Sequence, residues 1–525
     1  MKQENADLPQ VLNLNEAAQF IRISEKTLGE IARQNRIPCQ KVGREWRFLR
    51  PALENWLTGN EEEGVRSGKD QPTQVQRKQG NLSEESGFRD TAFTKNRNEP
   101  LHRWVPWIAG YSAAFVDGVF DQLVSKPAEK VTILDPFSGV GTTLVEGFKR
   151  GYNVAGFEIN PFAALACRIK LNCHGYDLAL FRKRARQFLQ FMAKHESDSA
   201  MPKSSAPPGF VSRSPFFSPS VERQVLFVLD FIQAEKEAWL QDVIRLALGS
   251  VMVGFSNYSY EPSLGRRASA GKSDVLEAEV AAVLASKLEE MRLDMELLRQ
   301  QMSSFPHLPK AHVYAESFLE KGARLPAHSI DLLITSPPYL NNYHYLRNSR
   351  PHLYWLNMVK RPEDLKEMEQ QSFGKFWQTV RSGPILTLAF HDTELERLIN
   401  RLRRENPERE VYGGIGWANY AVTYFNDCDR FFRVTNRVLR RGGRAVIVIG
   451  NNILQGIEFK TDELLARIAE RHGFETIRLH RVRTKRTGSS IINSSVRVGA
   501  GNHRAELYET AVELRLQDQS GLSRK

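Results

Sequence analysis

A glycine-rich turn between a short apolar run and a helical stretch constrains the fold of this chain more than any other feature. The apolar run covers residues 131–134, and the turn over residues 135–143 reads Asp-Pro-Phe-Ser-Gly-Val-Gly-Thr-Thr. Glycines at such a place permit a tight strand-to-helix turn and a close approach of the backbone to a ligand. We therefore predict a strand, a ligand-binding turn and a helix over residues 143–150.

Three further apolar runs have the length and composition of buried strands. They cover residues 154–157, 330–334 and 445–449. Continuous apolar strands that alternate with helices are typical of a mostly parallel sheet covered on both faces. We expect this α/β domain to have a first half over residues 99–175 and a second half over residues 310–515. Residues 176–309 are predicted to form a helical insert, in which residues 278–302 show the clearest helical spacing of apolar side chains.

A small separate unit is predicted over residues 1–58. Asn15 can cap a first helix and Ser24 a second, and an alternating stretch around Gly43 predicts a hairpin. A last short helix is expected over residues 52–57. Two helices, a turn and a basic hairpin are the layout of a winged helix-turn-helix, and the segment resembles the excisionase-type DNA-binding domains.

That resemblance implies DNA contacts from both parts of the small unit. The residues on or beside the recognition helix would be Lys26, Thr27 and Arg33, and those on the wing would be Lys41, Arg44 and Arg47. A helical module that docks another protein is the alternative interpretation.

The charge and cysteine content of the 525 residues narrow the class of protein. A formal net charge of +12 favours a polyanionic partner, nucleic acid before a membrane. No apolar run is long enough to span a membrane, and the four cysteines form no C-x-x-C pair. We therefore expect a cytoplasmic protein with reduced thiols, no metal site and no membrane contact. The polar residues 59–98 are expected to be a flexible linker, and residues 516–525 a disordered tail.

The turn at residues 135–143 resembles motif I of the S-adenosylmethionine-dependent methyltransferases, in the Asp-Pro-Phe form typical of enzymes that modify amino groups of nucleic acids. Residues 103–115 resemble motif X, which folds over the methionine end of the cofactor, and residues 158–161 resemble motif II, whose acidic residue holds the ribose. Residues 313–317 occupy the place of motif III. These resemblances imply cofactor contacts from Tyr111, Ser112, Asp135, Phe137, Gly139, Gly141, Thr142, Glu158, Asn160 and Glu316.

The strand predicted over residues 330–334 ends in Thr335-Ser-Pro-Pro-Tyr339. An exocyclic amine is a poor nucleophile because its lone pair is delocalised into the ring of the base. Hydrogen bonds from its N–H groups to the Ser336 hydroxyl and the Pro337 carbonyl would pull it toward a tetrahedral geometry, in line with the methyl donor. Tyr339 offers a ring to stack on a base rotated out of the duplex.

This segment resembles motif IV of the amino DNA methyltransferases, which implies catalytic roles for Ser336, Pro337, Pro338 and Tyr339. Members with Ser at the first position mostly methylate N4 of cytosine, whereas those with Asp or Asn mostly methylate N6 of adenine. The resemblance therefore implies a site-specific methyltransferase of double-stranded DNA, with cytosine N4 favoured and adenine N6 as the alternative.

The order of the motifs implies a target-recognition region in the helical insert. We expect the protein to serve a restriction-modification system. Its endonuclease would be a separate chain, because this sequence shows no convincing nuclease carboxylate cluster. Basic stretches that could line a DNA channel cover residues 265–272, 342–350 and 481–504, and Arg266 and Arg267 are the contacts expected from the first.

Two further functions are compatible with the same motifs. The transfer-RNA guanine-N2 methyltransferases share an Asp-Pro-Phe motif I and a proline-pair motif IV, but they normally carry an RNA-binding domain in front. The other possibility is a DNA-binding regulator that retains the fold without activity.

Overall fold

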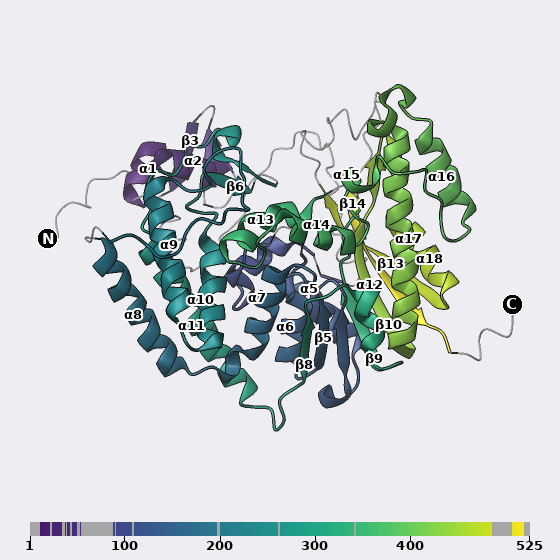
Figure 1. Ribbon diagram of the computed structural model, residues 1–525, viewed down its shortest axis with the longest axis horizontal. Coiled ribbons are helices and arrows are strands. Elements are labelled where there is room, and N and C mark those ends of the chain that lie inside the picture. The colour runs from purple at the N-terminus through teal and green to yellow at the C-terminus, as the bar shows by residue number, and fades with distance from the viewer. Residues whose placement is uncertain are drawn as a thin grey trace. The chain divides into compact units, whose positions relative to one another are not determined.

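The computed structural model of the chain has two compact units, Met1–Gln79 and Gly80–Lys525 (Figure 1). The residues that the structure describes are 11–21, 24–33, 37, 39–42, 45–49, 53, 88–89, 91–107, 110–196, 200–260, 263–340, 343–485 and 507–518. No helix in these ranges has the length and apolar character needed to cross a membrane.

The first unit contains the two helices and the hairpin that the sequence predicts. Its elements are β1 (Val11–Leu12), α1 (Leu14–Phe20), α2 (Glu25–Arg33), β2 (Gln40–Val42) and β3 (Glu45–Leu49). Strand β3 pairs antiparallel with both β1 and β2. Ala17, Leu28 and Phe48 are fully buried between the helices and this small sheet.

The cap of the first helix differs from the prediction. Asn13, not Asn15, is the N-cap: its side chain accepts a hydrogen bond from the Glu16 amide at 3.0 Å, and the Glu16 carboxylate accepts from the Asn13 amide at 2.8 Å. This reciprocal pair satisfies two amides that the first turn leaves unpaired, which Asn15 inside the helix cannot do. Ser24 does cap the second helix, since its hydroxyl accepts from the Thr27 amide. Of the helix expected over residues 52–57, only Leu53 lies within the described residues.

A seven-stranded sheet forms the centre of the second unit, with the order β13-β14-β10-β9-β4-β5-β8. The strands are β4 (Thr132–Asp135), β5 (Asn153–Phe157), β8 (Ala311–Tyr314), β9 (Ile330–Thr335), β10 (Leu439–Gly450), β13 (Phe474–Lys485) and β14 (Leu507–Leu516). Strand β14 runs antiparallel to β10 and β13, and the other four pairs of neighbours are parallel, so the mostly parallel sheet is confirmed. The carboxyl ends of β4, β5 and β9 therefore meet at one edge.

Helices cover both faces of this sheet. The first face carries α5 (Ala113–Leu123), α6 (Thr142–Lys149) and α7 (Pro161–Asn172), and the second carries α12 (Phe318–Lys321), α17 (Gly414–Val438) and α18 (Thr461–Arg471). Neighbouring strand residues face opposite sides, so that Ile133 joins the first core cluster and Leu134 the second.

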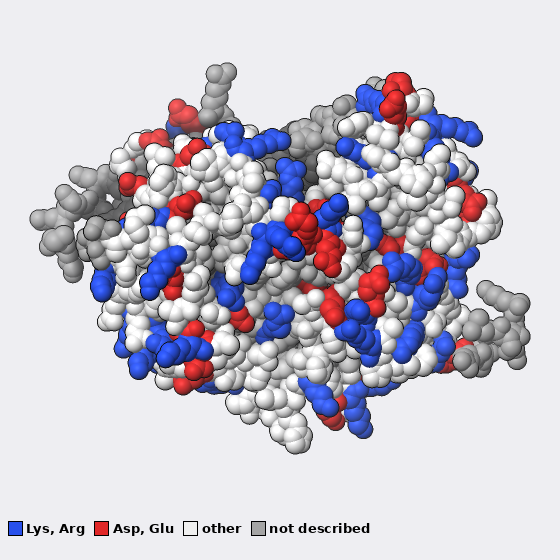
Figure 2. Space-filling model, viewed as in Figure 1, with Lys and Arg blue, Asp and Glu red and all other residues white. Residues whose placement is uncertain are grey.

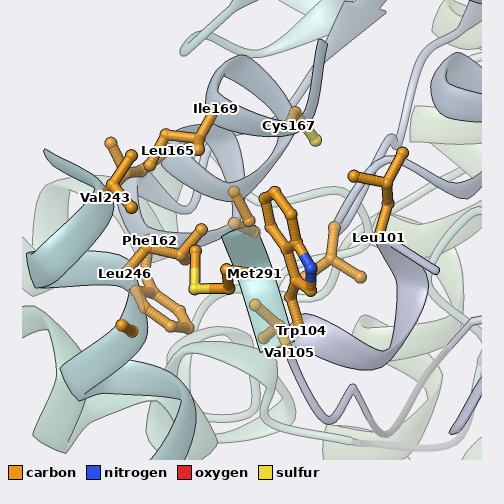
Figure 3. Close-up of a cluster of buried hydrophobic side chains, with 14 of the residues drawn as sticks. Leu101, Trp104, Val105, Phe162, Leu165, Cys167, Ile169, Val243, Leu246 and Met291 are labelled. Carbon is orange, nitrogen blue, oxygen red and sulfur yellow. The ribbon is translucent and has the colours of Figure 1, made fainter. Parts of the chain in front are cut away.

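The helical insert packs on the first face and shares its core. Its elements are α8 (Leu178–Glu196), α9 (Pro219–Ala234), α10 (Ala238–Val251), the hairpin of β6 (Tyr258–Tyr260) and β7 (Leu264–Arg266), and α11 (Val280–Met302). Figure 3 shows Met291 of α11 and Leu246 of α10 beside Phe162 of α7 and Trp104. The insert is therefore continuous with the first half of the α/β domain.

Two features of the second unit differ from the sequence expectation. Folded structure begins before residue 99, because Phe88 is 2% exposed and residues Phe93–Asn98 form a 3-10 helix, within the stretch expected to be linker. A second insertion also separates β9 from α17. It contains α13 (Tyr345–Trp355), α14 (Pro362–Gln371), α15 (Trp377–Val380) and α16 (Thr393–Arg403).

Candidate active site

The glycine-rich turn has a backbone that only glycine adopts readily. Gly139 and Gly141 have φ values of +50° and +89°. A Cβ atom on Gly141 would lie 3.0 Å from Cys167 Sγ, and one on Gly139 would lie 3.1 Å from Trp107 Nε1. The turn therefore needs glycine for its conformation and for close contact with α7 and Trp107.

Helix α7 holds the turn through two buried side chains. The Lys170 ammonium donates to the Val140 carbonyl at 2.8 Å, and the Cys167 thiol donates to the Gly139 carbonyl at 3.2 Å. Burial lowers the pKa of Lys170 to about 8. With these carbonyls satisfied, the shape of the turn is set before any ligand binds.

Asp135 joins three segments that are distant in the sequence. Its carboxylate accepts hydrogen bonds from the Thr335 hydroxyl at 2.6 Å, the Tyr111 hydroxyl at 2.9 Å and the Phe137 amide at 3.1 Å. The Tyr111 hydroxyl also contacts Thr143 at the start of α6. Asp135 is 2% exposed, and burial raises its pKa while these hydrogen bonds oppose the rise. The segments that resemble motifs X, I and IV thus meet at one carboxylate.

Glu158 follows β5 directly and faces the glycine turn. One carboxylate oxygen accepts from the Gly139 amide at 2.9 Å, and the other accepts from the Asn160 amide at 2.8 Å. Burial raises the pKa of Glu158 to about 7. The Ile159 amide is a further backbone donor to this carboxylate. A carboxylate has about four acceptor positions, so it can still accept from a ligand hydroxyl.

Asn160 links the first half of the α/β domain to the segment after residues 336–339. Its side-chain oxygen caps α7 by accepting from the Phe162 amide at 3.1 Å, and its side-chain nitrogen donates to the Ser349 hydroxyl at 2.7 Å. Ser349 belongs to α13, so a hydrogen bond joins the second insertion to the first half of the α/β domain.

Motif IV continues from β9 toward β10 and β14. The Ser336 hydroxyl donates to the Val448 carbonyl at 3.0 Å, which leaves the lone pairs of its oxygen as acceptors. Pro337 is buried and Pro338 half-buried. The Tyr339 hydroxyl donates to the Glu509 carboxylate at 3.4 Å, and burial raises the pKa of Tyr339.

A pocket lined mainly by aromatic rings lies beside both halves of the site. Its empty volume, which includes the mouth open to solvent, is about 450 Å³. Trp107 in its wall lies over Gly139, and the hydroxyl of Tyr345 contacts the backbone of Tyr339. Burial lowers the pKa of His352 to about 4, so its imidazole is neutral. The lining residues are Val105, Pro106, Trp107, Phe162, Gly249, Tyr260, Tyr343, Tyr345, Asn348, Ser349 and His352.

The sequence expectation names none of these aromatic rings as a site residue, although Trp107 lies in the segment that resembles motif X and Tyr343 and Tyr345 lie in the basic stretch 342–350. The one local signal is the run Asn-Tyr-His-Tyr over residues 342–345, which follows motif IV directly. Tyr260 and Trp107 come from distant segments, and only the packing of the insert brings them to the pocket.

Four other residues expected at the cofactor have contacts within the fold. Ser112 is fully buried and caps α5, and Thr142 is the first residue of α6. The Phe137 ring packs edge-on against Phe373, toward α17. Glu316 lies at the carboxyl end of β8 and pairs with Arg324 at 2.7 Å.

The residues expected to contact DNA are distributed over both units. Thr27 is exposed on α2, and Arg47 pairs with Glu45 at 2.6 Å. In the second unit Arg266 is exposed on β7, whereas the Arg267 guanidinium donates to the Ser273 carbonyl at 2.8 Å. Arg44 and the side chains of Lys26, Arg33 and Lys41 lie outside the described residues.

Comparisons with known proteins identify relatives of this chain. A family model described as a helix-turn-helix domain matches residues 11–61, which confirms the prediction for the first unit. The chain is 22% identical over 433 residues to the type II methyltransferase M.BsoBI of Geobacillus stearothermophilus, a match that covers 76% of this chain and 83% of that protein. It is 21% identical over 431 residues to the type II methyltransferase M.AvaI of a Nostoc species, covering 78% and 86%. The type II methyltransferase M.MvaI of Kocuria varians is 20% identical over 353 residues, covering 65% and 74%.

Proposed function

We propose that this relative of the type II methyltransferases is a site-specific DNA methyltransferase, which moves a methyl group from S-adenosylmethionine to an exocyclic amino group. The observation that carries the proposal is the hydrogen bond of 2.6 Å from Thr335 to Asp135. It joins the catalytic motif to the glycine turn across the parallel strands β4 and β9, at the sheet edge where α/β folds bind ligands. The homology over most of the chain supports methyl transfer.

The residues of the first half fit S-adenosylmethionine. When bound, this group supplies a methyl group on a positively charged sulfur. The turn at Gly139–Gly141 allows close backbone approach, and the Glu158 carboxylate would accept from the ribose. Tyr111 acts through Asp135, which it helps to hold in place.

The second half would activate the acceptor. Ser336 and the Pro337 carbonyl accept hydrogen bonds from the amino group of the base, which concentrates its lone pair on nitrogen. Tyr339 provides a ring at the same loop for the extruded base. Because the Ser336 proton points to Val448, the serine oxygen is oriented as an acceptor.

Ser336, at the first position of motif IV, favours N4 of cytosine as the atom that is methylated. Mass spectrometry of nucleosides from cells that express the protein should show N4-methylcytosine, and sequencing of the modified DNA should map it to one site. N6-methyladenine in its place would contradict the choice of base. A lack of any methylated base beyond the control strain would contradict DNA methylation.

Parallel assays with labelled S-adenosylmethionine distinguish the alternative substrates. We expect label on duplex DNA and none on transfer RNA, and labelling of transfer RNA alone would overturn the proposal. A protein that neither binds the cofactor nor modifies DNA would be a regulator. We propose that any partner endonuclease is a separate chain. A gene for an endonuclease next to the gene for this protein would support that proposal.

We propose DNA contacts in each of the two units, taken separately. On the face in Figure 2, basic side chains lie among acidic ones, so the net charge of +12 does not form a single patch there. The hairpin that carries Arg266 is tied to α13, because the Leu264 amide donates to the Asn348 side chain at 2.8 Å. We therefore place the target-recognition region in the insert, close to motif IV, with Arg266, Arg267 and the helix-turn-helix residues as DNA contacts.

The affinity for S-adenosylmethionine should rise with pH. Burial raises the pKa of Glu158 to about 7, and a ribose hydroxyl donates more strongly to the carboxylate than to the neutral acid. Below this pH the proton must leave on binding, so the Kd should be about tenfold weaker at pH 6 than at pH 8. Calorimetric titration measures this change, and Glu158→Gln should remove most of it. A wild-type Kd that stays constant over this range would contradict the assigned contact.

A further inference from the structure

A chain of hydrogen-bonding side chains runs from motif IV to a buried carboxylate on β14. The Tyr339 hydroxyl donates to Oε1 of Glu509 at 3.4 Å, and the Thr91 hydroxyl donates to Oε2 at 3.0 Å. The Tyr339 hydroxyl also contacts the Ser336 side chain. Glu509 is therefore two hydroxyl groups away from the site proposed for the amino group of the base.

Glu509 lies at the same edge of the sheet as the cofactor turn. In register it is opposite Gly450 on β10 and Arg483 on β13. Its residue exposure is 8%, and the Arg483 guanidinium is 4.0 Å from Oε2, with 43% of the arginine side chain exposed. One end of the carboxylate thus faces the partly buried Tyr339, and the other faces a group in contact with solvent.

Methylation of an exocyclic amine releases a proton that needs an acceptor. The nitrogen forms a new bond to carbon and carries a positive charge until one of its N–H bonds breaks. A serine hydroxyl alone is a poor final acceptor, because its protonated form is a strong acid. A carboxylate can hold the proton, provided that hydroxyl groups connect it to the nitrogen.

We propose that Glu509 is the final acceptor of this proton, which reaches it through the hydroxyl groups of Ser336 and Tyr339. The inference rests on the proposed function. The amine N–H bond breaks and leaves its electron pair on nitrogen, and the proton joins Ser336 Oγ. The Ser336 proton passes to the Tyr339 oxygen, and the Tyr339 proton passes to Oε1 of Glu509. Both hydroxyls end neutral, and the carboxylic acid later releases the proton to water beside Arg483.

The single proton of the Ser336 hydroxyl has two acceptors within reach. The Val448 carbonyl is 3.0 Å away, and the Tyr339 hydroxyl is the other contact. The relay uses the orientation in which the Ser336 O–H points to the Tyr339 oxygen. Rotation about the Cβ–Oγ bond of Ser336 produces it. In both orientations the serine oxygen keeps lone pairs for the amine.

The test compares variants that keep the shape of the site. Glu509→Gln can still accept from Tyr339 but cannot take up a proton, and Tyr339→Phe keeps the ring but breaks the relay. Each should lower the single-turnover rate of methyl transfer to duplex DNA by about 100-fold. The double variant should be no slower than either single one, because the groups act as a unit. The Kd values for S-adenosylmethionine and DNA should stay within about twofold of wild type.

Glu513→Gln is the matched control. Glu513 faces the same side of β14 and is 5% exposed, but its partners are His480 at 2.7 Å and Arg444. This variant should retain the wild-type rate. Thermal unfolding of the cofactor-free variants adds a measurement without turnover: the losses in Tm from Glu509→Gln and Tyr339→Phe should be less than additive.

Three outcomes would overturn the relay. They are a Glu509→Gln rate within about twofold of wild type, additive effects on rate and Tm, or an equal loss of rate in Glu513→Gln. A wild-type protein that transfers no methyl group to DNA would overturn the proposed function and the relay together. An active wild type with a fast Glu509→Gln variant would overturn the relay alone.

Discussion

Replacing Asp135 with Ala is expected to weaken S-adenosylmethionine binding by at least about 100-fold and to lower the free energy of unfolding by about 3–5 kcal/mol. The carboxylate accepts hydrogen bonds from Thr335, Tyr111 and the Phe137 amide. Each donor would lose this acceptor in a site with 2% exposure, and Tyr111 would keep its contact with Thr143. The side-chain links from the turn to motif X and to motif IV would then be lost. Calorimetry for the Kd and urea unfolding for stability measure the two effects.

Asp331→Ala separates loss of binding from loss of stability. Asp331 lies at the start of β9 and accepts from the Thr132 amide at 2.9 Å, at the opposite edge of the same two strands. It also pairs with Lys126 at 2.9 Å. This variant should unfold more easily and still bind the cofactor when folded. Cofactor binding by Asp135→Ala at the wild-type Kd would contradict the role of Asp135.

Ser336→Ala is expected to lower the rate of methyl transfer by about 100- to 1,000-fold while cofactor binding remains near the wild-type value. The hydroxyl is the proposed acceptor for the amino group and the first member of the relay. Its loss leaves the Val448 carbonyl without one donor, at a site that is only half-buried, so the fold should persist. Single-turnover kinetics with labelled S-adenosylmethionine and duplex DNA measure the rate.

A second serine on the approach to β9 provides the control for this prediction. The Ser329 hydroxyl donates to the Pro326 carbonyl at 2.7 Å, at the amino end of the strand. Ser329→Ala should keep the wild-type rate. If Ser336→Ala instead lost only affinity for DNA, with an unchanged rate at saturation, then motif IV would bind the substrate without activating it.

Local patterns were sufficient to predict several elements of the fold. The apolar runs before Asp135 and before Thr335 became the neighbouring strands β4 and β9, because short continuous apolar segments are buried on both faces of a parallel sheet. Helix α11 follows from its apolar spacing. The cap of α1 was predicted at Asn15 instead of Asn13, since both are asparagines and only the position of Glu16 completes the capping box.

The second insertion and the partners of the site could not be predicted in the same way. Helices α13 to α16 follow motif IV without a pattern that separates them from the α/β domain. Thr91 and Glu509 are 418 residues apart, and Thr335 and Asp135 are 200 apart. No local periodicity relates residues at such separations.

The sequence by itself determined the strand–turn–helix with its glycines, the loop from Ser336 to Tyr339 and the two helices of the helix-turn-helix, because each depends on backbone conformations and side-chain spacing within a short segment. The tertiary structure decided which groups meet: Asp135 with Thr335, Glu158 with the Gly139 amide, and Tyr339 with Glu509. The physical reason is that these contacts follow from strand order and from the burial of polar groups, which must find partners once the sheet excludes water.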